Sequence, residues 1–322
     1  MKTLIKTVET GFDNALALLQ QGAPVAVPTE TVYGLAADAT NGVAIACIYE
    51  AKGRPSFNPL IVHVDSLAMA QRVGVLDDQM QKLADKFWPG PLTLIVPLCA
   101  NSTIHPLALA GLDTVALRMP VGALADLISA LGKPLAAPSA NKSGHLSPTS
   151  AEAVAASLDG RIELVLDGGP TIIGVESTII GRLNGELTLL RPGGIAAEVI
   201  ESFIGKPLKR LKSSEILAPG MMASHYAPNA QVRLNATEVS RGEAYLGFGN
   251  SPVVGIPIAT LNLSEAAELN EAAQNLFSHL RALDAENPAC IAIATIPMTG
   301  LGEAINDRLR RAAAPRNDND GA

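Results

Sequence analysis

The strongest constraint on the fold is the alternation of short β-type runs with helical stretches from the N-terminus to about residue 205. Runs such as "PVAVP", "PLIVHV" and "TVALRMP" are rich in branched apolar residues, and apolar residues recur at helical spacing between them. This alternation is typical of an α/β domain, in which helices cover a twisted sheet. Helices are expected near residues 11–21, 43–51, 77–87, 122–131 and 150–158.

The alternation stops in the segment "GKPLKRLKSSEILAPGMMASHYAPNA", which gathers proline, serine and basic residues. The β-type runs "QVRL", "AYLGFG", "VVGIPIATL" and "CIAIATIP" follow, with a long helix expected near 264–284 and a last one near 302–313. The sequence therefore predicts a first α/β domain over residues 1–207, a linker over 208–229, and a smaller α/β domain over 230–322 whose tail, 314–322, is disordered.

Charge and cysteine usage exclude several classes of protein. The net charge of the 322 residues is -7, and both parts of the chain are mildly acidic, whereas tight nucleic-acid binding usually needs a basic patch. The three cysteines lie far apart, which suggests neither a zinc site nor a disulfide framework and fits a cytoplasmic location. No apolar run approaches the roughly 20 residues that span a bilayer, so no membrane association is expected.

Two polar loops follow expected strands of the first domain. The loop "VPTETVYGLAADAT" carries Thr31, and the loop "LAAPSANKSGHLSPTS" carries Ser139, Asn141 and Ser147. Ligands of α/β proteins usually bind where strands end. The same residue types also form turns for purely local reasons, so either interpretation is open for one loop alone.

The stretch "KGRPSFNPLIVHV" places two cations in a loop that leads into an apolar strand. Lys52 and Arg54 stand two positions apart, as expected around a small anionic ligand. His63 lies near the end of the strand, and a histidine in that place is more often a hydrogen-bonded core residue than a general base.

Two further arginines lie in or at the end of expected strands. Arg118 is inside "TVALRMP" and Arg191 ends "LTLLRPGG", and a guanidinium near a sheet core needs an anion. That anion is either a ligand or a structural partner such as Asp113 or Glu176. Ser177, in "GVESTII", places a further hydroxyl at a strand edge, although this glycine-rich region matches neither dinucleotide-binding nor P-loop patterns.

Taken together, these motifs resemble a known family. The segments "PTETVYGL", "KGRPSFNPLIVHV", "WPGPLTLIV", "VALRMP", "APSANKSGHLSPT", "GVESTII" and "LRPGGI" are similar, in order and spacing, to the YrdC-like L-threonylcarbamoyladenylate synthase family over nearly the whole first domain. "APGMMASHYAP" and the small domain after it resemble the long, two-domain form. The resemblance implies an open twisted mixed β-sheet with flanking helices, followed by a smaller Rossmann-like α/β domain.

The resemblance also implies a reaction and its site. L-threonine, bicarbonate and ATP would give threonylcarbamoyl-AMP and pyrophosphate, and a tRNA threonylcarbamoyl-transfer complex would use the product. Lys52 and Arg54 would be the catalytic cations, and Mg²⁺ would be held mainly by ATP phosphates. ATP would contact Arg54, Asn58, Thr114, Ser139, Asn141, Ser147, Arg191 and Tyr226, and threonine would contact Thr31, His63, Arg118 and Ser177.

The chain departs from the family pattern in two places. Val121 and Gly122 stand where the family often has His-Pro, and Met222, Ala223 and Ser224 stand where basic residues often precede "HYAP". Two alternatives stay open at this point: an RNA-binding module, and a carbamoyl-transfer enzyme of related fold, which usually carries acylphosphatase and zinc-finger signatures that this sequence lacks. The linker is expected to bring Tyr226 across the site as a lid.

Overall fold

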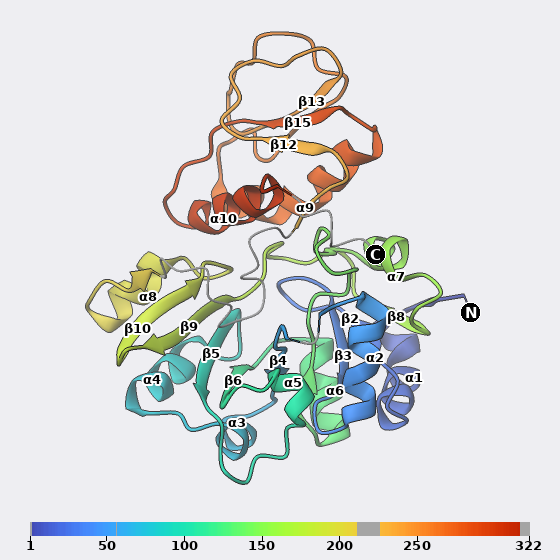
Figure 1. Ribbon diagram of the computed structural model, residues 1–322, viewed down its shortest axis with the longest axis vertical. Helices are drawn as coiled ribbons and strands as arrows, with labels where there is room; N and C mark the ends of the chain where they lie inside the picture. The colour runs from blue at the N-terminus through green and yellow to red at the C-terminus, as the bar shows by residue number, and fades with distance from the viewer. Residues whose placement is uncertain (1, 56, 211–225, 316–322) are drawn as a thin grey trace.

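The computed structural model describes residues 2–55, 57–210 and 226–315, and these residues form two sheets (Figure 1). The larger sheet is mixed and has eleven strands in the order β1-β8-β2-β3-β7-β4-β6-β5-β9-β10-β11. Its strands are β1 (Leu4–Thr7), β2 (Val25–Val27), β3 (Gly34–Asp38), β4 (Ile61–His63), β5 (Leu92–Pro97), β6 (Thr114–Arg118), β7 (Leu135–Ala136), β8 (Leu164–Asp167), β9 (Thr178–Leu183), β10 (Glu186–Arg191) and β11 (Lys209–Arg210).

Helices flank this sheet, and the smaller sheet lies beyond it. The larger domain contains α1 (Val8–Gln20), α2 (Gly42–Lys52), α3 (Leu67–Val73), α4 (Asp78–Phe87), α5 (Pro106–Leu109), α6 (Ala123–Leu131), α7 (Ala151–Leu158) and α8 (Ala197–Ile204). The smaller domain has a four-stranded parallel sheet in the order β12-β15-β13-β14. Its elements are β12 (Gln231–Arg233), β13 (Glu243–Gly247), β14 (Thr260–Asn262), α9 (Leu269–Ala285), β15 (Cys290–Ile293) and α10 (Gly302–Ala312).

The α/β class and the large mixed sheet with a smaller domain are confirmed, while three details differ from the expectation. β3 forms an antiparallel hairpin with β2, where the sequence suggested only a polar loop. Of the expected strand over 253–261 only its end belongs to β14, and Ile256 is 90% exposed. The long helix begins at Leu269, not near 264.

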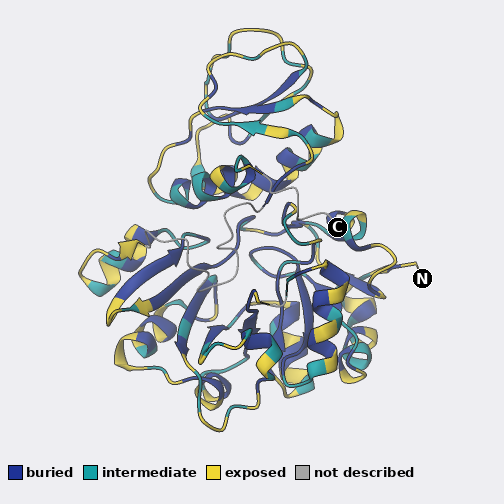
Figure 2. Ribbon diagram, in the orientation of Figure 1, coloured by how far each residue is buried: buried dark blue, intermediate teal, exposed yellow. Residues whose placement is uncertain are grey.

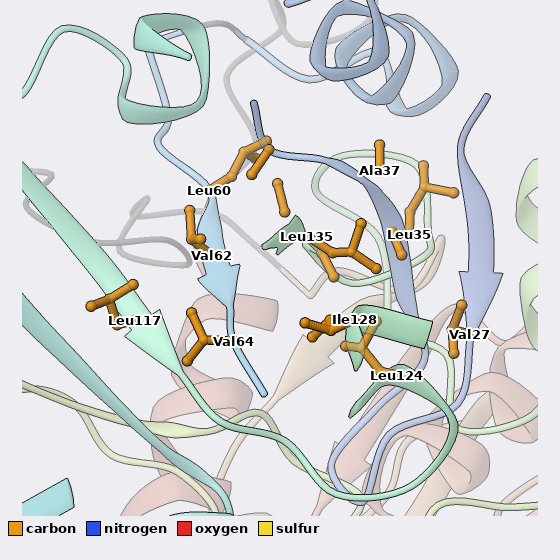
Figure 3. Close-up of a cluster of buried hydrophobic side chains, with 14 of the residues drawn as sticks. Val27, Leu35, Ala37, Leu60, Val62, Val64, Leu117, Leu124, Ile128 and Leu135 are labelled. Carbon is orange, nitrogen blue, oxygen red and sulfur yellow. The ribbon is translucent and has the colours of Figure 1, made fainter. Parts of the chain in front are cut away.

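The core of the larger domain lies between the sheet and its helices. The strands are mostly buried and the outer helix faces exposed (Figure 2). Leu124 and Ile128 of α6 lie beside Val27, Leu35 and other strand residues (Figure 3). Such burial contributes about 1.5–3 kcal/mol for each large aliphatic side chain and fixes the strand ends that carry the polar loops.

The two domains pack closely through α9 and α10, which lie between the smaller sheet and the larger domain (Figure 1). Val32 and Val175 of the larger domain belong to the same apolar cluster as Phe277 of α9. Gly174 shows how close the approach is, because a Cβ there would lie 2.4 Å from the backbone of Ala273. The second domain is therefore positioned next to the segment that leads into β9.

None of the described helices is long and apolar enough to cross a membrane. The departures at Met222, Ala223 and Ser224, most of the expected linker, and tail residues 316–322 lie outside the described residues.

Candidate active site

The cationic loop begins where α2 ends. Asn41 caps the start of this helix by accepting hydrogen bonds from two backbone amides, and Gly53 ends it with a left-handed φ of 58°. Lys52 therefore lies in the last helical turn and Arg54 just beyond the turn. Arg54 donates through Nε to the Asn58 carbonyl (3.3 Å) and through Nη2 to the Pro59 carbonyl (3.0 Å), which fixes it against its own loop.

His63 and Arg118 are brought together by strand pairing. β4 and β6 are parallel neighbours, and His63 is in register with Arg118. Neighbouring residues in register on adjacent strands project to the same face of a sheet. Both side chains are buried, with 2% and 4% exposure, and both line one pocket.

Arg191 and Ser177 meet because β9 and β10 are antiparallel, so that β9 begins where β10 ends. Arg191 donates through Nη2 to the Ser177 carbonyl (2.9 Å) and hydroxyl (3.2 Å). Gly193 allows the chain to pass close by, because a Cβ there would lie 2.3 Å from the Glu176 carbonyl oxygen. The glycines of "RPGG" thus serve the geometry of this corner.

A single pocket collects most of the expected site residues. Eight of the thirteen line it, together with the apolar residues Val32, Ile61, Ala137 and Pro138 and the carboxylate of Glu176. The eight are Thr31, Arg54, His63, Arg118, Ser139, Ser177, Arg191 and Tyr226.

Three arginines give this pocket its electrostatic character. Burial lowers the pKa of Arg54 to about 10, and the nearby charge of Arg191 lowers it too. This pKa is still well above 7, and the guanidinium is therefore charged at neutral pH. Burial also lowers the pKa of Arg191. Cations that repel one another in a buried site are stabilised by an anion, which favours a polyanionic ligand over a neutral one.

Arg118 is paired in the structure with Glu30, an acid of the loop "VPTETVYGLAADAT" that was not named as its partner. Its Nη2 lies 2.6 Å from Oε1 of Glu30, and its Nη1 donates to Thr31 Oγ1 at 3.0 Å. The departure at Val121 and Gly122 lies beside this pair, because the Val121 amide donates to Glu30 Oε2 at 3.5 Å. Gly122 has a φ of 78°, a conformation that glycine adopts without strain.

Glu176 forms the other buried carboxylate network. It accepts from Ser147 Oγ (2.5 Å) and from Nε of Arg308 (2.7 Å), a residue of α10. Burial alone would raise the pKa of Glu176, but the charges of Arg308 and Arg191 and the Ser147 bond lower it to about 2. Glu176 is therefore a structural anion at neutral pH.

Two family profiles match the chain. The one described as "Telomere recombination", which covers Sua5, YciO and YrdC proteins, spans residues 17–193, and the one described as "Threonylcarbamoyl-AMP synthase, C-terminal domain" spans residues 195–314. The threonylcarbamoyl-AMP synthase of Bacillus subtilis is 42% identical, with 97% of this chain and 95% of the relative covered. That of Pyrococcus abyssi is 39% identical, with 94% of each covered.

The chain belongs to the Sua5 family of threonylcarbamoyl-AMP synthases. A solved structure of P. abyssi Sua5 complexed with L-threonine superimposes with a TM-score of 0.88 at 37% identity, covering 97% of this chain and 98% of that one. As a Sua5 family member it is a nucleotidyltransferase that uses ATP to make threonylcarbamoyl-AMP for the threonylcarbamoyladenosine modification of tRNA. These full-length similarities favour the synthase over the two alternatives of the sequence analysis.

The five remaining residues expected from the Sua5 resemblance do not line the pocket. Lys52 is 2% exposed, and its Nζ donates to the carbonyls of Ser139 and Asn141 at 2.5 Å each. Asn141 donates through Nδ2 to two carbonyls of its own loop. Ser147 donates a hydrogen bond to Glu176 and does not itself line the pocket. Asn58 is buried in the loop of Arg54. Thr114 begins β6, at the opposite end of the strand from Arg118.

His63 is neutral in this setting. Burial lowers its pKa to about 3, and the charge of Arg118 lowers it as well. Its Nδ1 is buried and has no hydrogen-bond partner in the part of the chain that the structure describes. His63 can therefore exchange a hydrogen bond with a bound ligand, and its low pKa makes it only a weak general base.

This pKa predicts a pH dependence of stability. Because the pKa of His63 is depressed in the folded state, its contribution to stability is complete above 6.5, its pKa in the unfolded chain. This contribution is lost as the pH falls toward 3. The free energy of unfolding should fall by about 2 kcal/mol between pH 7 and pH 5 through this group. Urea unfolding of the His63→Gln variant should show a correspondingly smaller decrease in the free energy of unfolding between pH 7 and pH 5.

His279 is the necessary control, because burial lowers its pKa too, so it contributes a loss of stability of the same sign as the pH falls. Glu176 contributes only below its ordinary pKa of 4.5, outside the interval. An equal loss in wild type and His63→Gln, with a smaller one in His279→Gln, would contradict the assignment to His63.

Proposed function

We propose that this pocket binds L-threonine and ATP side by side, with the threonine carboxylate at Arg118 and the triphosphate at Arg54 and Arg191. The observation that carries the proposal is the convergence of three buried arginines on one pocket lined by hydroxyls. One monoanionic carboxylate and one polyanion match this arrangement in charge.

The threonine end is formed by residues from four separate segments. The guanidinium of Arg118 offers a planar fork to the carboxylate, with the Thr31 hydroxyl already bonded to it at 3.0 Å. Ser177 shares a hydrogen bond of 2.7 Å with Thr93 and presents a second hydroxyl. Neutral His63 accepts or donates a hydrogen bond at the pocket wall, as a threonine hydroxyl or amine requires. The L-threonine complex of the P. abyssi relative supports L-threonine as a ligand.

The ATP end is formed by Arg54, Ser139, Arg191 and Tyr226. Lys52 supports it from behind, because its Nζ donates to the backbone on both sides of Ala140 and so fixes the loop of Ser139. Asn58, Asn141 and Ser147 keep their expected ATP-side roles as proposals, exercised through the loops that carry Arg54 and Ser139 or through Glu176. Thr114, at the far end of β6 from Arg118, keeps its expected ATP contact as a proposal.

The reaction places charge where these cations lie. The threonine nitrogen attacks the carbon of bicarbonate, and loss of water gives a carbamate. A carbamate oxygen then attacks the α-phosphorus of ATP, the bond to the bridging oxygen of the β-phosphate breaks, and pyrophosphate leaves with the electron pair. Arg54 and Arg191 stabilise the charge that develops on pyrophosphate.

Magnesium is expected with ATP, and the protein residues do not by themselves form a site for it. Among the described residues no group of three or more His, Cys, Asp or Glu could hold a metal ion, and both oxygens of Glu176 are already engaged. Mg²⁺ would enter on the phosphates, where it neutralises part of their charge.

We also propose the division of the chain into a catalytic domain over 1–207, a linker over 208–229 and a second domain over 230–322. The larger sheet ends at Lys209–Arg210 and the smaller one begins at Gln231, which supports a boundary between them. Three free cysteines support a cytoplasmic location, where a tRNA threonylcarbamoyl-transfer complex would take up the product.

The test is to identify the product. Incubation with ATP, L-threonine and ¹³C-bicarbonate should give a compound whose mass equals that of threonylcarbamoyl-AMP with one heavy carbon. Serine in place of threonine serves as the control for the amino acid. Release of AMP without incorporation of the label would overturn the proposed reaction.

A further inference from the structure

Arg308 is a fully buried cation that the second domain inserts against the wall of the pocket. Its side chain is 0% exposed although it belongs to α10, the last helix among the described residues. Its Nε donates to Glu176 Oε2 (2.7 Å), and its Nη1 donates to the Pro192 carbonyl (2.9 Å) and to Asp307 Oδ2 (2.7 Å). One guanidinium thus bridges the two domains.

The two acceptors in the larger domain lie directly behind the ATP end. Glu176 precedes Ser177 in the chain, and Pro192 follows Arg191. Arg191 is itself bonded to the Ser177 carbonyl, at 2.9 Å. Arg308 therefore holds the end of β10 and the start of β9 at the point where Arg191 enters the pocket.

The same cation reaches two further residues with proposed ATP-side roles, Ser147 and Tyr226. Glu176, which pairs with Arg308, also accepts a hydrogen bond of 2.5 Å from the Ser147 hydroxyl. The guanidinium carbon of Arg308 lies 5.2 Å from the centroid of the Tyr226 ring, within range of a cation–π contact. Phe277 of α9 packs on Tyr226 as well, with ring centroids 5.6 Å apart.

We propose that Arg308 is a positioning residue for ATP, through which the second domain fixes Ser147, Arg191 and Tyr226. The inference rests on the proposed function, because it takes Arg191 and Tyr226 to contact ATP and Ser147 to act behind them through Glu176. Thr31, His63, Arg118 and Ser177, at the threonine end, have no hydrogen bond or ion pair with Arg308 among the described contacts. Ser177 is reached only indirectly, through Arg191 and its chain neighbour Glu176. Loss of Arg308 should therefore affect ATP far more than threonine.

A purely stabilising role gives a different result. If Arg308 served only to neutralise Glu176, its loss would reduce the fraction of folded enzyme and lower the apparent kcat, with both KM values unchanged. Removing the charge of Glu176 as well would then restore the fraction of folded enzyme and the apparent kcat. The double variant Glu176→Gln/Arg308→Met does this, because glutamine keeps an oxygen that accepts from the Ser147 hydroxyl.

The experiment compares Arg308→Met, Arg308→Lys and the double variant with wild type in full-length protein, by pyrophosphate release and thermal melting. Arg210→Met is the matched control. Arg210 pairs at 3.2 Å with Glu303 of α10, the helix that carries Arg308, but Arg210 is 43% exposed and does not line the pocket. We expect a rise of about tenfold or more in the KM for ATP in Arg308→Met and in the double variant, and less than about twofold in the KM for threonine. Arg308→Lys should recover part of the loss, and Arg210→Met should match wild type.

Two outcomes would overturn the inference: wild-type KM for ATP in a folded double variant, or an equal rise for ATP and threonine. If Arg308→Met does not fold, the double variant decides. The proposed function is judged separately, because it requires wild-type pyrophosphate release to depend on threonine and bicarbonate, whereas the inference depends only on the ratio of the two KM values among variants.

Discussion

Replacement of Arg118 by alanine is expected to weaken threonine binding about 10- to 150-fold, because it removes the charge-assisted fork proposed for the carboxylate. ATP binding should change by less than about threefold, since the arginines proposed for the phosphates remain. Isothermal titration with each substrate separately measures the two constants. A loss confined to ATP would reverse the assignment of the two ends of the pocket.

The pairing of Arg118 with Glu30 adds an effect on stability. Their side chains are 5% and 8% exposed, and removal of one partner of a buried ion pair costs about 3–5 kcal/mol because the other charge stays unpaired. Arg118→Lys keeps a cation beside Glu30 but loses the planar fork, so it should fold and still bind threonine weakly. Glu30→Gln keeps the fork and should bind threonine within about threefold of wild type.

Replacement of Arg54 by alanine should lower kcat about 100- to 1,000-fold, as removal of a donor aimed at developing charge does in other enzymes. The KM for threonine should stay within about threefold, because Arg54 is assigned to the phosphate end. Steady-state pyrophosphate release at saturating substrates measures the effect. A kcat within threefold of wild type would remove Arg54 from the catalytic residues.

Lys52 and Arg182 provide the comparison for this result. Lys52→Met should raise the KM for ATP and lower the melting temperature, because it leaves the carbonyls of Ser139 and Asn141 without their donor. Arg182→Met, which removes a partly exposed ion pair with Asp77, should leave kcat unchanged and cost at most about 1 kcal/mol of stability. Equal losses of kcat in Arg54→Ala, Lys52→Met and Arg182→Met would indicate a general effect on folding.

The polar loops at the strand ends could be predicted from the sequence because their chemistry is local. Thr31, Ser139 and Ser177 are hydroxyls that directly precede or follow apolar runs, and the pocket does gather them. β3 could not be predicted in the same way. Its sequence, GLAAD, has no β-branched residue and is buried throughout, so neither propensity nor alternation marked it as a strand.

Arg308 could not be recognised because the last helix contains three arginines close together. Arg310 is exposed and Arg311 is partly buried with Asp307, whereas Arg308 is fully buried against Glu176. Only the packing of α10 on the larger domain separates them. Glu30 could not be recognised as the partner of Arg118 for a similar reason, because Arg118 lies on a strand 88 positions away in the chain.

Lys52 illustrates a different limit of sequence reasoning. Its spacing from Arg54 predicts a pair of cations facing the same ligand, yet the helix end at Gly53 separates them. The structure gives one side chain to the pocket and the other to the loop behind it. The contribution of Lys52 to catalysis therefore stays a prediction.

The measurement that tests the account most directly is pyrophosphate release from ATP with threonine, bicarbonate, both or neither. The account predicts release only when both are present, because the carbamate that attacks the α-phosphorus forms from the two together. Arg118→Lys should need a higher threonine concentration for the same rate. Equal release with either small substrate omitted would contradict the account, because the nucleophile would then not be a carbamate formed on the threonine that Arg118 binds.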